Sequence, residues 1–164
     1  MTNSSGSLTK MKTTIPPPIS DPRVGDLIDA AIAARLREDY SDATHQAYRA
    51  LALASGEHRY YRMVVLRELG YAFKQRKDFV SAAVCYRNAV ALWPKGELVS
   101  WGLFSSLLRL RCLDEAFQEA IRFLSLRKSE IYDATLLNPD YGRGLPPSAR
   151  ALCEQAKQLA ARWS

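Results

Sequence analysis

Apolar residues recur every three or four positions along most of the chain, a spacing that places them on one face of an α-helix. The first such stripe runs from Val24 to Leu36. Further stripes predict helices over about 43–54, 58–76, 78–94, 97–111, 114–128 and 148–163. No segment alternates between apolar and polar residues as a half-buried strand would. The pattern therefore predicts an all-α fold of antiparallel helix pairs joined by short turns.

Capping residues mark where these helices begin and end. Asp21 is expected to be an N-cap and Pro22 the first helical residue. Proline suits that position because the N–H that it lacks would have no partner within the helix. Gly56 is expected to end the second helix in the left-handed conformation. The other helix starts are predicted to be capped by Asp42, Asp78, Asp114 and Ser148.

The helix pairs repeat along the chain. Ala43, Ala82 and Ala116 stand in the same local pattern, at offsets of 39 and 34 residues. The middle unit carries a fuller motif, in which small and large residues alternate as closely packed helices require. Its residues are Leu66, Leu69, Gly70, Phe73, Ala82, Tyr86, Ala89 and Pro94. This motif resembles the tetratricopeptide repeat family, whose units are helix–turn–helix pairs of about 34 residues.

The resemblance implies a right-handed α-solenoid of about three helix pairs with a C-terminal capping helix. The repeats would cover about 24–56, 58–94 and 97–128, and the cap would cover 148–163. Residues 21–164 then form one helical repeat domain, preceded by a disordered lead over 1–20 that ends in three prolines. The connector over 131–147 is rich in turn-forming residues and departs from a regular fourth repeat.

The resemblance also implies where a partner binds. In the family, the first helix of each pair lines a concave face that holds a peptide or protein segment. Aromatic, aliphatic and basic residues on such a face suit an acidic or amphipathic partner. The expected partner-binding residues are Val64, Arg67, Tyr71, Lys74, Leu98, Trp101, Ser105, Leu108 and Arg109. The alternative is that Trp101 and Leu108 only pack on a neighbouring helix.

Two departures from the family narrow the expected partner. Some members bind a C-terminal acidic tail through a clamp of basic and asparagine side chains. Here Tyr71 and Gly102 stand where asparagine is expected, and Leu98 stands where lysine is expected. Binding of a chaperone tail is therefore not expected.

The net charge of +6 raises a second possibility. Residues 24–128 carry 16 basic and 12 acidic side chains, which is less dense than the basic patch of a dedicated nucleic-acid binder. A basic edge could still form, because pairs of cations recur at the ends of the three first helices. They are Arg35 with Arg37, Lys74 with Arg76, and Arg109 with Arg111. Cations at helix C-termini also complement the helix dipole, which is the simpler interpretation.

Residues that carry chemistry are sparse. His45 and His58 are the only histidines, and no motif for a nucleophile, a metal or a phosphate accompanies them. We therefore expect no enzyme activity, catalytic residue, metal or cofactor. Cys85, Cys112 and Cys153 are expected to be free, buried thiols of a cytoplasmic protein. No run of about 18 apolar residues occurs, so no membrane partner is expected.

Together these features predict a non-catalytic protein-binding module. Bacterial chaperones of secreted proteins, immunity proteins that block a toxin, and general adaptors share this organisation, and the sequence leaves the choice among them open. The alternative is a protein that binds nucleic acid or a ribonucleoprotein through the basic edge. Nothing in the sequence indicates the oligomeric state.

Overall fold

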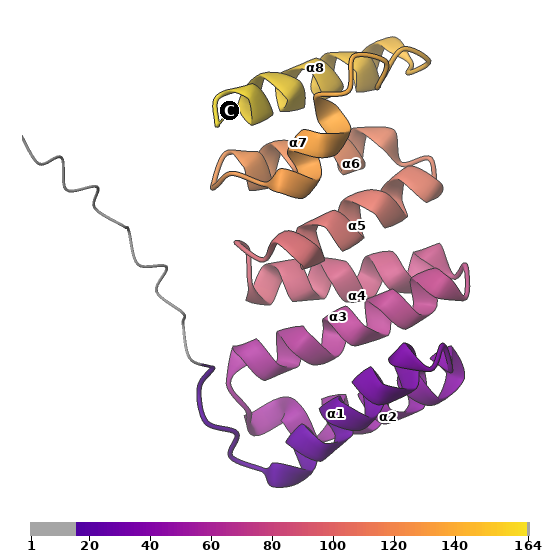
Figure 1. Cartoon of the computed structure of the whole chain (residues 1–164), viewed down its shortest axis with the longest axis vertical. Coiled ribbons are helices and arrows are strands. Elements are labelled where there is room, and N and C mark those ends of the chain that lie inside the picture. Colours follow the sequence, from indigo (N-terminus) through magenta and orange to yellow (C-terminus); the bar gives the residue numbers. More distant parts are fainter. Residues whose placement is uncertain (1–15, 164) are drawn as a thin grey trace, which may run out of the picture.

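Between residues 16 and 163, eight α-helices stack in chain order along the long axis of the molecule (Figure 1). The computed structural model describes residues 16–163, and within that range no residue is in a strand. This confirms the predicted all-α solenoid. The helices are α1 Pro22–Leu36, α2 Tyr40–Leu53, α3 Arg59–Gln75, α4 Phe79–Leu92, α5 Glu97–Arg109, α6 Leu113–Leu124, α7 Glu130–Leu136 and α8 Pro147–Ala161, with a 3₁₀ turn, η1, at Ala54–Gly56.

The first six helices form three pairs, and each pair packs on the next. The connector over 131–147 differs from the expected succession of turns, because it contains α7. The hydroxyl oxygen of Ser129 accepts the backbone N–H of Tyr132 at 3.1 Å and caps this helix. Tyr132 and Leu136 are fully buried and anchor α7. The last helix, α8, packs on α6 and α7 and covers the C-terminal end of the stack.

The predicted helix starts are confirmed at Asp21 and Asp78, whose carboxylates accept backbone N–H groups of the first turn. The prediction for Asp42 is wrong, since α2 begins three residues earlier and its cap is Asp39. The predictions for Asp114 and Ser148 are also wrong. α6 and α8 follow Cys112 and Pro146, and neither helix has a side-chain cap.

The predicted role of Gly56 is wrong as well. α2 ends at Leu53, and the 3₁₀ turn η1 follows it directly, with Gly56 as its last residue. The glycine has no positive φ angle. A tightened last turn satisfies the carbonyl groups that a left-handed glycine would otherwise satisfy.

The turn inside each pair is instead made by a charged residue with positive φ. Glu38, Lys77 and Arg111 have φ angles of 61°, 63° and 63°. At the middle turn the N–H of Asp78 donates to the carbonyl of Phe73 at 2.9 Å, and the N–H of Lys77 donates to the carbonyl of Lys74 at 3.1 Å. This is the Schellman arrangement that usually carries glycine. All three turns use it, so the same geometry reverses the chain in each repeat.

Replacing Lys77 with glycine is expected to raise the free energy of unfolding by about 1 kcal/mol. A side chain in the left-handed region costs about 1–2 kcal/mol, and part of that gain is offset by the greater freedom of glycine in the unfolded chain. Urea unfolding of Lys77→Gly and the parent chain measures the difference. Arg76→Gly is the matched control, because Arg76 has a φ of −76° and gains nothing from glycine. Equal midpoints for the two variants would contradict the argument.

The chain before α1 is attached to the helices. The backbone N–H groups of Ser20 and Asp21 donate to the carboxylate of Glu57, at 3.0 and 2.6 Å. The hydroxyl of Tyr61 donates to the carbonyl of Pro17, and Ile19 packs against the core. Residues 16–20 therefore differ from the disordered lead expected over 1–20, and residues 1–15 lie outside the described range.

A buried polar cluster joins α5, α6 and α7. The hydroxyl of Ser100 donates to the carboxylate of Glu119 at 2.5 Å and lies 3.0 Å from the hydroxyl of Tyr132. The Arg122 guanidinium donates to both oxygens of the same carboxylate, at 2.6 and 2.7 Å. Glu119 is only 7% exposed, so these hydrogen bonds take the place of water in stabilising its negative charge.

Tyr86 of α4 lies between two helices that lack side chains at the point of contact. Its ring would be 2.9 Å from a Cβ placed on Gly70 of α3 and 2.3 Å from a Cβ placed on Gly102 of α5. Real Cβ atoms do not approach a ring so closely, so both glycines are required for this packing. The expected role of Gly70 as a small residue at a helix contact is confirmed.

None of the helices among residues 16–163 has the length and apolarity needed to cross a lipid bilayer.

Candidate functional site

The face made by α1, α3 and α5 carries two adjoining pockets. These three helices contact one another in succession, more extensively than α2, α4 and α6 do. We call the pockets central and turn-side; their volumes are about 300 and 450 Å³, and together they are the groove. The central pocket is lined by Arg35, Arg67, Glu68, Tyr71, Lys74, Tyr86, Leu98, Trp101 and Gly102. The turn-side pocket is lined by Lys74, Gln75, Lys77, Phe79, Trp101, Ser105, Leu108 and Arg109.

The structure brings together all the predicted partner-binding residues except Val64. Lys74 and Trp101 line both pockets and connect them. Val64 is 7% exposed and belongs to the core, so its prediction is wrong. Its side chain is part of the main core cluster and lines neither pocket.

Trp101 and Leu108 satisfy both of the interpretations made from the sequence. Each is partly buried and packs against the core, and each also lines a pocket. The Trp101 ring lies 5.3 Å, centroid to centroid, from the ring of Tyr132 on α7, in an edge-to-face contact. One side of the indole is therefore fixed by the core while the other borders the groove.

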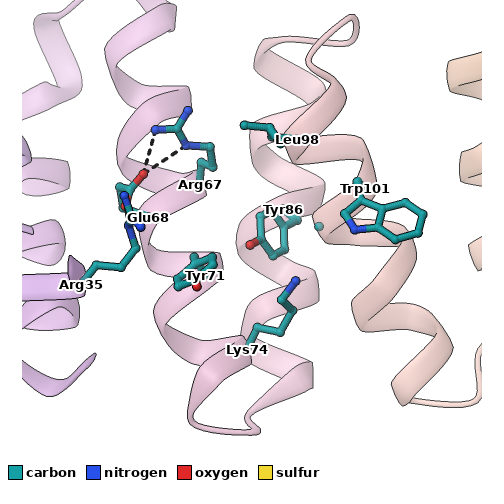
Figure 2. Close-up of a pocket in the computed structure, with 9 residues that line it drawn as sticks. Arg35, Arg67, Glu68, Tyr71, Lys74, Tyr86, Leu98 and Trp101 are labelled. Carbon is teal, nitrogen blue, oxygen red and sulfur yellow. Dashed lines mark hydrogen bonds and ion pairs between the residues drawn. The ribbon is translucent and has the colours of Figure 1, made fainter. Parts of the chain in front are cut away.

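Glu68 lies between two arginines at the wall of the central pocket (Figure 2). Its carboxylate accepts a hydrogen bond from Arg35 Nε at 2.7 Å and from Arg67 Nη2 at 2.8 Å. The carboxylate neutralises one of the two guanidinium charges. Arg35 also lies 5.2 Å from the ring centroid of Tyr71, a cation–π contact across α1 and α3. These contacts hold the side chains of the wall in place, and the wall keeps a net positive charge.

Lys74 adds a second positive charge between the pockets. Its ammonium lies 3.5 Å from the hydroxyl of Ser105. Burial lowers the pKa of the Lys74 ammonium, because the neutral form is favoured away from water. A carboxylate placed beside this ammonium would stabilise its charged form, so the lysine favours an anionic group in the groove.

Tyr86 forms the floor of the central pocket. Figure 2 shows its ring between the ribbons of α3 and α5, below Leu98 and above Lys74. Burial raises the pKa of the Tyr86 hydroxyl, which therefore stays protonated and available as a hydrogen-bond donor at neutral pH. The ring can occupy this place only because Gly102 has no side chain, since a Cβ there would lie 2.3 Å from it.

Several groove residues were not expected as partner-binding residues. Three of them do appear in the sequence patterns. Arg35 belongs to the basic edge, Gly102 stands at a clamp position, and Tyr86 is part of the repeat motif. Their shared position was not predicted, because it depends on how three repeats align. The remaining unexpected residues are Glu68, Gln75, Lys77 and Phe79.

The basic edge is interrupted by internal contacts. Arg35 is paired with Glu68, and Arg37 lies 3.5 Å from Asp42. Arg109 lies 5.1 Å from the ring centroid of Phe79. Arg76 and Arg111 are exposed. Three of the six cations of the edge therefore already contact an acidic or aromatic side chain.

Within residues 16–163, no three histidine, cysteine, aspartate or glutamate side chains come together in a way that could hold a metal ion. All three cysteines are free. Cys85 and Cys153 are buried, as expected, whereas Cys112 is only partly buried. Burial raises the pKa of the Cys85 thiol to about 11, so this cysteine is not poised as a nucleophile.

Comparison with known proteins identifies the architecture. No family model matches the chain, and a search of the curated proteins gives no match. Among solved structures, a mutant O-GlcNAc transferase of Thermobaculum terrenum matches 84% of this chain with a TM-score of 0.62 and 20% sequence identity. The chain spans 26% of that structure, so the likeness concerns the fold of one part of it. The likeness and the helix pairs together support a tetratricopeptide-like helical-repeat fold.

Proposed function

We propose that the protein is a non-catalytic protein-binding module whose groove holds an acidic or amphipathic segment of a partner protein. The observation that carries the proposal is the convergence of Arg67, Tyr71, Lys74, Leu98 and Trp101 on the central pocket. These residues come from two successive repeats. Stacking of the helices does not by itself require polar, basic and aromatic side chains to meet at one pocket. Helical repeats commonly offer such a surface to an extended partner.

The chemistry of the groove selects the segment. Arg35, Arg67 and Lys74 outnumber the one carboxylate of Glu68, which leaves an excess of positive charge. Trp101, Leu98 and the Tyr86 floor provide apolar area for an anchoring side chain. An acidic residue next to a bulky apolar residue meets both requirements. A secretion chaperone, an immunity protein and an adaptor in the cytoplasm would each use the groove in this way.

Lys74→Ala and Trp101→Ala are each expected to weaken binding of a partner recovered by pull-down by about tenfold or more, because buried aromatic and charged anchors dominate interface energies. Isothermal titration calorimetry measures the affinities, and thermal unfolding checks that each variant is folded. The matched control is Arg87→Ala, since Arg87 is exposed on α4, lies outside both pockets and forms an exposed ion pair with Glu115 at 2.9 Å. Partner affinity that falls with Arg87→Ala and not with Lys74→Ala would contradict the proposal.

A further inference from the structure

A third pocket lies at the opposite end of α3 from the turn-side pocket. We call it the loop-side pocket; its volume is about 610 Å³. The axial rise from Arg59 to Tyr71 along α3 is about 18 Å, so the loop-side and central pockets are separate. It is lined by Arg59, Leu92, Trp93, Pro94, Lys95, Leu126 and Arg127.

The charge of this pocket is entirely positive. Arg59, Lys95 and Arg127 are exposed, and no ion pair among residues 16–163 includes any of them. The helix dipole accounts for Lys95 and Arg127, which follow the C-termini of α4 and α6. It does not account for Arg59, the first residue of α3, because a cation at a helix N-terminus is unfavourable. Its guanidinium lies over the Trp93 ring, 5.6 Å from the centroid, and this contact offsets the unfavourable position while the side chain stays exposed.

The apolar part of the pocket is exposed and already formed. Leu126 is 43% exposed, a high value for a leucine beside Trp93 and Leu92. The α4–α5 loop that forms one wall is held from α6 and the turn after it. Arg122 Nη1 donates to the Pro94 carbonyl at 2.9 Å, and Arg127 Nη1 lies 3.4 Å from the Lys95 carbonyl. A preformed pocket loses little conformational entropy when it is filled.

We propose that the loop-side pocket is a second docking site, for a protein segment that presents carboxylates beside a bulky apolar side chain. The three cations would pair with the carboxylates, and Leu126, Leu92 and Pro94 would receive the apolar group. This inference does not depend on the occupant of the groove. It gives the protein two sites of similar chemistry on different surfaces, so two segments could bind at once.

The observations favour a protein segment over single-stranded nucleic acid. Nucleic acid that binds without sequence preference needs open aromatic faces on which its bases stack. The Trp93 ring is the only aromatic ring that lines the loop-side pocket. The Arg59 guanidinium lies 5.6 Å from its centroid and covers one face, and Tyr60 contacts it in an edge-to-face arrangement. The other uncharged lining residues are aliphatic.

The three tryptophans allow the sites to be tested separately. Trp93 lines the loop-side pocket, Trp101 lines the groove, and Trp163, whose indole donates to the Leu124 carbonyl, lines neither. In ¹⁵N-labelled protein each indole N–H gives its own NMR signal. The probe is a synthetic peptide of about 12 residues with alternating Leu and Glu, long enough for one site. The Trp93 indole and the Leu126 amide are expected to shift on titration.

The proposal further predicts that Lys95→Glu with Arg127→Glu lowers the peptide affinity measured at the Trp93 signal by about tenfold or more. Arg76→Glu with Arg111→Glu changes the net charge equally and is expected to leave that affinity within about twofold. The proposal is overturned if both pairs act alike, if a peptide with Lys for Glu binds equally well, or if only an oligonucleotide shifts Trp93. If only the Trp101 signal shifts, the loop-side proposal is overturned and the groove proposal stands. If only the Trp93 signal shifts, the groove proposal is overturned and the loop-side proposal stands.

Discussion

Replacing Glu119 with alanine is expected to destabilise the protein by about 3 kcal/mol, the low end of the range for breaking a buried ion pair. The substitution removes the acceptor of the Ser100 hydroxyl and of both Arg122 hydrogen bonds. Arg122 is a third exposed, so water recovers part of its hydration, and this keeps the loss from being larger. Urea unfolding followed by circular dichroism measures the change.

The matched control is Glu115→Ala, one turn earlier on the same helix. Its ion pair with Arg87 is exposed on both sides, at 54% and 58%, and such pairs contribute between 0 and about 1 kcal/mol. Tyr132→Phe in the Glu119→Ala background tests whether the cluster acts as a unit. The effects of the two substitutions should not add, because Tyr132 and Glu119 share Ser100 as a partner. Equal losses for Glu119→Ala and Glu115→Ala would contradict the assigned role of the cluster.

The second large effect is expected for Gly102→Ala, which should lower the free energy of unfolding by about 2 kcal/mol. The new methyl group would lie 2.3 Å from Tyr86 Cε1, and Gly70 on the other side leaves the ring no space to move away. Overpacking of this severity costs about 3 kcal/mol, and the better helix propensity of alanine offsets about 1 kcal/mol. Thermal and urea unfolding measure the net loss.

A second substitution can restore the space. Tyr86→Leu removes the ring, so Gly102→Ala should cost much less in that background than in the parent chain. Gly144→Ala is the control for the substitution itself, since a Cβ on Gly144 meets no atom within 4 Å. A Gly102→Ala variant as stable as the parent would show that the ring is not confined between α3 and α5. The same variant should also reduce the depth of the central pocket.

The repeat motif made the architecture predictable from the sequence. Leu69, Ala82, Ala116 and Phe123 are all buried where the motif places them, because spacing alone decides which face of a helix is apolar. The short helix α7 was not predictable in this way. Only Tyr132 and Leu136 of its seven residues are buried, and that is too short a stripe to distinguish a helix from a turn.

The candidate site was predictable only in part, for a different reason. Repeat register places Arg67, Tyr71 and Lys74 on one side of α3, and that side does line the pocket. The register does not indicate that Arg35, one repeat earlier, reaches Glu68, because their contact depends on the angle between successive pairs. The sequence did not indicate Asp39 as the cap of α2. The turn before it places Glu38 in the left-handed conformation, where glycine is the usual signal.

The shortness of α7 sets a limit on the length of what the groove can hold. The groove crosses α1, α3 and α5, whose neighbouring axes are about 10 Å apart, which gives a span of about 20 Å. α7 occupies the place of the next first helix, but it has seven residues and its Tyr132 is turned inward against Trp101. An extended chain advances about 3.3 Å per residue. A segment lying straight across the three helices would therefore contact them through about six residues, and α7 adds no further repeat to lengthen this span.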